Sequence, residues 1–177
     1  MWNLLDDPAV AGDWTLEPEN SSVRFVSKTL WGLVPVNGRF TDVSGDARIT
    51  PDGQLTGRLV IRAESVRTGI GMRDRHLRAR DFFDVAAYPD IVVDVTGPAP
   101  DGQLAATLSI RGTTLPVPLQ ATLDRRGQVG AADSVGVSAR AEIDRTRWGV
   151  SGNMLGMMPP ATVLLADAVF VRAAGGA

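Results

Sequence analysis

Apolar and polar residues alternate with a period of two along most of the chain from Asp13 to Arg172. Such alternation is typical of β-strands that bury one face and expose the other. The clearest runs occupy residues 55–63, 104–110, 115–123 and 135–143, and weaker runs occupy 14–16, 22–27, 39–49, 90–96 and 162–171. The pattern therefore predicts an all-β protein of eight or nine strands.

Turn-forming residues separate several of these runs. Pro-Asp-Gly occurs at 51–53 and again at 100–102, and Arg-Gly-Gln occurs at 126–128. Proline presets φ for a turn, and the glycine that follows tolerates a positive φ. We expect antiparallel hairpins at all three places.

One segment departs from the period of two. Its apolar residues and its histidine recur at the spacing i, i+4, i+7 and i+11, which places them on one face of a helix of about three turns. They are Met72, His76, Ala79 and Phe83. The helix should begin after Gly71 and end before Pro89, because proline disfavours helical geometry in the residue that precedes it. We expect this face to pack on the core, with His76 as a structural residue.

Strands with one apolar face must bury that face, either between two sheets or inside a closed barrel. The chain has 177 residues, of which 44% are apolar, so one domain with a sizeable core fits its length. The inward positions mix glycine and alanine with larger residues, which favours an open interior over a filled one. We expect an N-terminal extension at 1–12, a barrel domain at 13–172 and a flexible tail at 173–177.

Composition removes several kinds of active site. The chain has no cysteine and one histidine, which excludes thiolate nucleophiles and multi-histidine metal centres. We therefore expect no metal, no cofactor and no catalytic residue. Glu142 and Asp144 lie on the polar side of their strand, so we expect them in solvent rather than as a hydrolytic pair.

Charge and hydropathy limit the partners and the location. The net charge is −2, which gives no overall attraction to nucleic acid. No window approaches the roughly 20 apolar residues that span a bilayer. The N-terminal residues lack the basic and apolar regions of a secretory signal, so we expect a cytoplasmic protein.

Four ordered motifs resemble the YceI-like family and together cover about 160 residues. The central one comprises Thr68-Gly69, Arg73-Asp74, His76-Leu77, Asp81-Phe82-Phe83-Asp84, Tyr88-Pro89 and Ile91. The others are Trp-Thr-Leu at 14–16 with Ser-Ser-Val-Arg-Phe at 21–25 and Gly-Arg-Phe at 38–40, Leu-Ser-Ile-Arg-Gly-Thr-Thr-Leu-Pro-Val at 108–117, and Ile-Asp-Arg at 143–145 with Trp-Gly-Val at 148–150. The resemblance implies an extended, lipocalin-like antiparallel barrel of about eight strands with one short helix. It also implies that long isoprenoid chains, such as polyprenyl phosphates or quinones, bind in a central pore.

Two apolar segments between strands are candidate parts of a ligand site. The loop at 29–35 would line the mouth of the barrel or fold onto it, and the methionine-rich segment at 154–160 would form an adaptable pocket wall or a plug. The predicted ligand-binding residues are Phe25, Trp31, Leu33, Phe40, Phe83, Trp148, Met154, Met157 and Met158.

A basic cluster surrounds the predicted helix. Arg73, Arg75, Arg78 and Arg80 could bind a pyrophosphate through paired guanidinium hydrogen bonds. They do not share one helical face, however, and carboxylates lie within reach, so ion pairs are the favoured interpretation. For Arg73 the family signature favours a buried structural pair with Asp74.

The leading hypothesis is a carrier or storage protein for a long apolar ligand of isoprenoid type. An alternative is an enzyme that cyclises or isomerises an apolar polyene by shape alone, without metal or triad. A third is a structural barrel whose interior is filled by side chains. The sequence leaves a homodimer open.

Overall fold

The computed structural model describes residues 2–29, 34–152 and 159–173. Within them the chain forms eleven strands, one α-helix and five short 3-10 helices. The strands are β1 (Gly12–Leu16), β2 (Ser22–Thr29), β3 (Val34–Phe40), β4 (Val43–Ile49), β5 (Leu55–Arg62), β6 (Val66–Arg67), β7 (Asp90–Pro98), β8 (Leu104–Ile110), β9 (Thr113–Val129), β10 (Ala132–Asp144) and β11 (Ala161–Arg172). The helix α1 is Gly71–Arg78, and the 3-10 helices are Asn3–Asp6, Pro8–Val10, Pro18–Asn20, Ala63–Ser65 and Arg145–Trp148.

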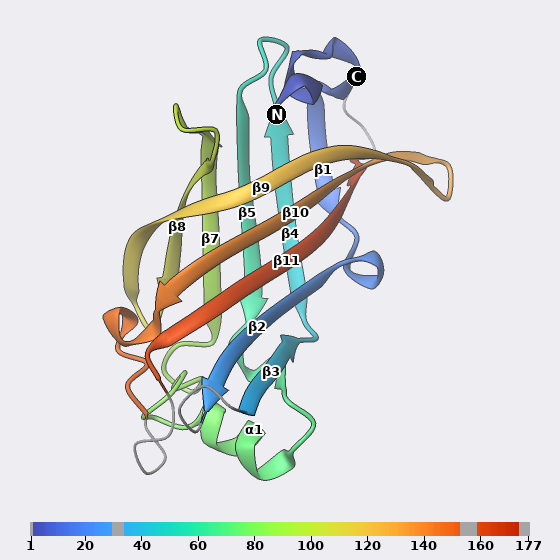
Figure 1. Ribbon diagram of the computed structural model, residues 1–177. Coiled ribbons are helices and arrows are strands. Elements are labelled where there is room, and N and C mark those ends of the chain that lie inside the picture. Colours follow the sequence, from blue (N-terminus) through green and yellow to red (C-terminus); the bar gives the residue numbers. More distant parts are fainter. Residues whose placement is uncertain (1, 30–33, 153–158, 174–177) are drawn as a thin grey trace.

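Eight of the strands form a closed antiparallel barrel, which confirms the predicted fold class. The ring runs β1-β4-β5-β7-β8-β9-β10-β11, and β1 closes it by pairing with β11. Closure gives each strand of the ring a hydrogen-bonded neighbour on both sides. Figure 1 shows the long β9, β10 and β11 crossing in front of the steeper β4, β5 and β7.

The remaining strands extend the barrel towards α1. β11 pairs with β1 near its C-terminus and with β2 nearer its N-terminus, and β2 then pairs with β3 and β3 with β6. The weak run at 39–49 was predicted as one strand, but the structure divides it between β3 and β4. Ser65 occupies the break, where its side-chain oxygen accepts hydrogen bonds from the backbone N–H groups of Thr41 and Asp42, both at 3.1 Å.

Two of the three predicted turns are confirmed, and the third is wrong. The Pro-Asp-Gly segments turn the chain with positive φ at Gly53 and Gly102. At 126–128, however, β9 continues, and the register shifts so that Arg125 opposes Val135 and Gly127 opposes Ser134. Glycine at φ +82° here accommodates a β-bulge rather than a hairpin turn.

The predicted helix exists but is shorter than expected and has the opposite face inward. α1 spans eight residues and buries Asp74 and Leu77, whereas Met72 and His76 are exposed. The prediction took the face with Met72 and His76 as the core face, whereas the face with Asp74 and Leu77 is buried. The buried carboxylate of Asp74 instead binds the backbone at Thr68, and this interaction sets the helix orientation.

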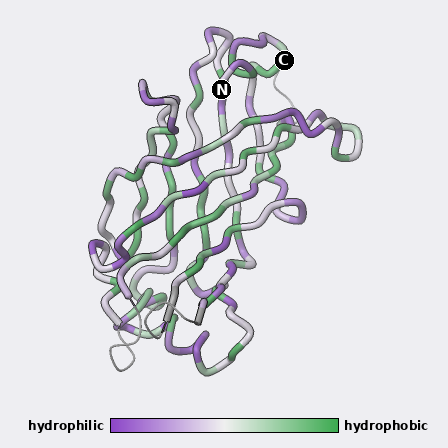
Figure 2. Tube along the Cα trace, viewed as in Figure 1, coloured by the Kyte–Doolittle hydropathy of each residue, from purple (hydrophilic) through white to green (hydrophobic). Residues whose placement is uncertain are grey.

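The buried residues form two hydrophobic clusters inside the barrel. Figure 2 shows the alternation of apolar and polar residues along the strands that supplies them. The N-terminal residues join the second cluster, because Leu5 and Val10 are buried against Trp14. Arg172 secures this end by lying 4.6 Å from the Trp14 ring centroid and donating a hydrogen bond to the Ala11 carbonyl.

None of the helices among the described residues is long and apolar enough to cross a membrane. Over the same residues, no group of three or more histidine and acidic side chains is arranged to hold a metal ion.

Candidate functional site

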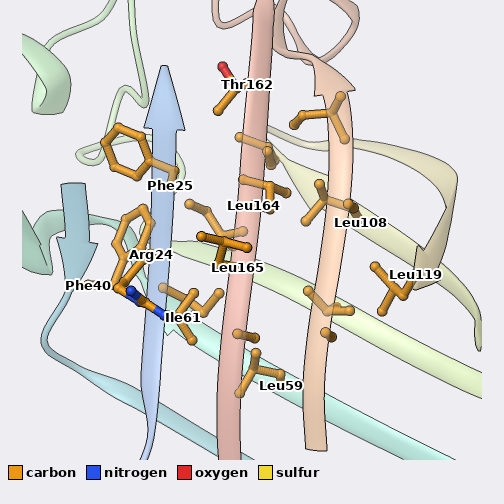
Figure 3. A pocket seen from close by; sticks show the side chains of 18 of the residues that line it. Arg24, Phe25, Phe40, Leu59, Ile61, Leu108, Leu119, Thr162, Leu164 and Leu165 are labelled. Atoms are coloured by element: carbon orange, nitrogen blue, oxygen red, sulfur yellow. The ribbon is translucent and has the colours of Figure 1, made fainter. Parts of the chain in front are cut away.

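An apolar cavity of about 200 Å³ lies inside the barrel. Side chains from β2, β3, β5, β7, β8, β9, β10 and β11 line it, together with Leu77 of α1. Figure 3 shows the side chains of Phe25, Leu59, Ile61, Leu108 and Leu164 converging on this space from their strands. A single water needs only about 10–15 Å³ on the same measure, so the space is far larger than a packing defect.

The cavity exists because small side chains stand where two neighbouring strands face inward. β10 contributes Ala139 and Ala141 to the lining, and β11 contributes Ala166 and Ala168. Ala139 lies directly opposite Ala166 in the register of the two strands. A methyl group at each of these positions cannot reach the far wall of an eight-stranded barrel, so the interior stays open.

Larger side chains complete the wall without closing it. Leu59, Val93, Leu119, Val137 and Leu164 point inward and line the cavity, yet each is only partly buried. The lining therefore offers an apolar surface to a guest molecule.

Aromatic side chains form the part of the wall nearest α1. The ring centroids of Phe25 and Phe40 are 5.9 Å apart, and those of Phe40 and Phe83 are 5.8 Å apart in an edge-to-face arrangement. Gly38 makes room for this cluster, because a Cβ at that position would collide with the Phe25 ring. Such tilted pairs are worth about 0.5–1.5 kcal/mol beyond their buried area.

A few polar groups border the cavity at the same end. Ser27 and Thr162 are buried with their hydroxyl oxygens 3.4 Å apart. The guanidinium of Arg145 lies 5.9 Å from the Phe82 ring centroid and donates hydrogen bonds to the carbonyls of Pro159 and Val150. Burial lowers the pKa of Arg145, while the nearby Asp144 carboxylate raises it. A guanidinium nevertheless keeps its proton in proteins, so Arg145 is a buried positive charge beside an apolar space.

A hydrogen-bonded cluster holds α1 against this end of the barrel. Asp74 accepts hydrogen bonds from the backbone N–H and the hydroxyl of Thr68, at 2.8 and 2.5 Å. Arg73 donates to the hydroxyl oxygen and the carbonyl oxygen of Thr68, at 2.8 and 2.9 Å. The predicted direct pair of Arg73 with Asp74 is therefore wrong in detail, since both residues bind Thr68. Desolvation raises the pKa of Asp74, but the Thr68 hydrogen bonds and the charges of Arg78 and Arg67 outweigh it and leave that pKa below its ordinary value.

The predicted site residues fall into three groups. Phe25, Phe40 and Phe83 line the cavity. Trp148 is buried, and its indole Nε1 donates a 2.8 Å hydrogen bond to the Leu108 carbonyl, but it is not among the described residues that line the cavity. The remaining five lie outside the described residues: Trp31, Leu33, Met154, Met157 and Met158. A ligand-binding role for all nine remains a prediction.

Sequence reasoning missed the alanines of β10 and β11 as site residues. Their signal was present in the alternating run at 135–143, where the inward residues become small. Alanine is common in ordinary cores, however, so the run by itself does not distinguish a cavity wall from close packing. Only the assembly of eight strands shows that, among the described residues, no side chain fills the space in front of them.

The comparisons with known proteins agree with this architecture. The model of the YceI-like domain matches residues 14–175. The YceI protein of Escherichia coli is 31% identical over 126 residues, which cover 67% of this chain and 65% of that protein, just under two thirds of its length.

Solved structures show the same fold. BcnA of Burkholderia cenocepacia superimposes with a TM-score of 0.71 at 22% identity, covering 87% of this chain and 98% of that chain. A polyisoprenoid binding domain from Saccharophagus degradans, implicated in plant cell wall breakdown, gives a TM-score of 0.71 at 20% identity, covering 90% of this chain and 98% of that chain. With the family model matching nearly the whole barrel, the chain belongs to the YceI-like family.

Proposed function

We propose that the protein binds one elongated apolar molecule of isoprenoid type inside the barrel, as a carrier or storage protein. The observation that carries the proposal is the open cavity with an almost wholly apolar lining. Water in such a space finds few hydrogen-bond partners, and apolar cavities of this kind take up apolar guests instead.

Burial of a hydrocarbon chain would supply the binding energy. Each buried CH₂ contributes about 0.8 kcal/mol, so one five-carbon isoprene unit would contribute up to about 4 kcal/mol. Ordering the chain and losing its free motion oppose this gain. Affinity therefore rises with chain length only until the cavity is full, and short prenyl compounds should show this limit directly.

The polar groups near α1 would hold the head of the ligand. Arg145 lies in the lining with Ser27 and Thr162, while the lining towards the other end, at Leu104 and Phe170, is apolar. A guanidinium suits a phosphate or a quinone oxygen, and the two hydroxyl groups can donate or accept. We expect the head group at this end and the chain directed along the barrel.

The described lining favours binding over acid–base catalysis. Among the described residues, its one buried ionisable side chain is Arg145, because Arg24 and Arg140 belong to the lining strands but are exposed on the outer face. Arginine does not exchange protons near neutral pH, so Arg145 can attract an anion but cannot serve as a general acid or base. The polyisoprenoid binding domain from Saccharophagus degradans shares the fold, which supports the class of ligand proposed here.

Native mass spectrometry of freshly purified protein tests the proposal. We expect an added mass corresponding to one lipid per chain, which lipid extraction and fragmentation would identify. Protein stripped of lipid should then bind a prenyl alcohol series, a polyprenyl phosphate or an isoprenoid quinone. If the protein carries no lipid and the stripped protein binds none of these compounds, the proposal is wrong.

A further inference from the structure

Three arginines form a continuous row on the outer face of the barrel near α1. Arg24 of β2 lies directly opposite Arg39 of β3, and Arg39 lies directly opposite Arg67 of β6. All three are exposed, and together with Thr68 they line a surface depression. Like charges placed directly opposite on neighbouring strands destabilise a sheet. A row of three is therefore a feature that needs a compensating partner.

The protein itself compensates this row only in part. Arg24 pairs with Asp167 at 2.9 Å, and Arg67 donates to the backbone carbonyls of Glu64 and Val66. Among the residues that the structure describes, Arg39 has no carboxylate partner.

The one carboxylate that borders the depression, Asp74, is buried and engaged by Thr68. The Asp74 carboxylate is ionised and offsets part of the charge of Arg67 and Arg78 nearby. Since Arg24 is neutralised by Asp167, the three guanidinium groups of Arg39, Arg67 and Arg78 still exceed that one carboxylate and leave this surface with a net positive charge.

Two large apolar side chains are exposed a few residues along the chain from Arg67. Ile70 is 53% exposed and Met72 is 61% exposed, and both lie at the start of α1, directly after the segment that carries Arg67. Arg75 is exposed on the same helix. Figure 1 places α1 below β3, at the end of the barrel opposite the N-terminal 3-10 helices. This outward-facing Met72 is the residue that the sequence pattern had assigned to the core.

We infer that Arg39, Arg67, Ile70 and Met72 form a docking surface for an anionic lipid bilayer. Cationic side chains attract the negatively charged leaflet, while nearby apolar side chains enter the boundary between head groups and acyl chains. A free phosphate ion would use the arginines but gains nothing from Ile70 and Met72, so the combination favours a bilayer.

The inference is independent of what the cavity binds, although it suits a lipid carrier. Leu77 of the same helix lines the cavity, so docking would bring the α1 end of the barrel to the lipid surface. The contact uses only outward-facing residues, none of which has been placed in the apolar wall. A protein with an occupied or obstructed cavity should therefore dock as well as the wild type.

Vesicle flotation with the full chain tests the inference. We expect binding to vesicles that contain phosphatidylglycerol, little binding to phosphatidylcholine vesicles, and weaker binding as salt rises. The double variant Arg39→Gln/Arg67→Gln should lower the affinity by roughly fivefold for each arginine removed. Ile70→Ser/Met72→Ser should lower it by roughly tenfold or more.

The matched control is Arg48→Gln/Arg58→Gln, which removes the same charge from the outer face of β4 and β5, far from α1 along the strands. It should keep most of the binding. Equal losses in the control and in Arg39→Gln/Arg67→Gln would show a non-specific charge effect and overturn the inference. The inference would also be overturned if the protein did not bind anionic vesicles. A third contrary result would be binding of inorganic phosphate at the arginine row while Ile70→Ser/Met72→Ser left vesicle binding unchanged. Docking that persists when the cavity is blocked separates this inference from the proposed ligand-binding function.

Discussion

Ala139→Phe tests whether the cavity is a real space that a ligand uses. Ala139 points into the cavity from β10 and is only partly buried. The substitution adds a phenyl ring to a space of about 200 Å³. In an open cavity the ring gains burial worth about 1.5–3 kcal/mol, reduced by some lost rotamer freedom. We expect the free energy of unfolding to rise by about 1–2 kcal/mol and the Tm to rise by a few degrees.

Ligand affinity should change in the opposite direction. A phenyl ring in the cavity displaces about four carbons of a prenyl chain, which costs about 3 kcal/mol and weakens the Kd by roughly a hundredfold. Thermal unfolding of lipid-free protein measures the stability, and isothermal titration with a prenyl ligand measures the affinity. Gln120→Phe, on the exposed face of β9, adds the same ring outside the barrel and should change neither quantity appreciably.

The two measurements together can refute the reasoning. Overpacking of a filled core costs about 1–3 kcal/mol, so a lower Tm for Ala139→Phe would show that the interior has no room. A higher Tm with unchanged affinity would show that the ligand binds elsewhere. Only greater stability combined with weaker binding agrees with the proposed site.

Two further predictions concern the residues that hold the barrel end and the wall. Asp74→Ala removes the acceptor for two Thr68 hydrogen bonds and should lower stability by about 2–3 kcal/mol in urea unfolding. Because the folded-state pKa of Asp74 is lowered, its contribution to stability is present above the unfolded pKa of about 3.9 and is lost as the pH falls through the lower folded value. Asp74→Asn should therefore weaken the dependence of the free energy of unfolding on pH below about pH 4. The same pH dependence in Asp74→Asn as in the wild type would contradict this role. Trp148→Phe leaves the Leu108 carbonyl without its 2.8 Å donor and should cost about 1–3 kcal/mol of stability. Since Trp148 is absent from the described cavity lining, its loss should leave ligand affinity nearly unchanged, and a large drop in affinity would assign it a direct contact.

Much of the fold followed from local patterns. The inward residues of the run at 104–110 are all buried in β8, as the alternation predicted. Both Pro-Asp-Gly turns occur where expected, because proline and glycine restrict the backbone by their own covalent geometry. The predicted turn at 126–128 was wrong because a distant strand decides the backbone conformation there. Gly127 supports a bulge because the partner strand β10 continues past it, and neighbouring residues alone do not reveal that pairing.

The candidate site was predictable only in part. Phe25, Phe40 and Phe83 were proposed as ligand-binding residues and do line the cavity. The alanines of β10 and β11 stand at inward positions of their alternating runs but cannot be told from ordinary core residues by sequence, and the inward face of α1 was predicted the wrong way round. Helical spacing identifies which residues share a face, but it does not say whether Met72 or Asp74 lies inward.

The sequence by itself determined that this chain is all-β, that its strands bury one face, and that it lacks the residues for thiolate or multi-histidine chemistry. These properties follow from side-chain type and from a period of two, and both are local. The tertiary structure decided that the buried faces enclose a space, that Ala139 and Ala166 meet across neighbouring strands to keep it open, and that three arginines form a row. These properties depend on strand register and on closure of the ring, which bring together residues far apart in the chain.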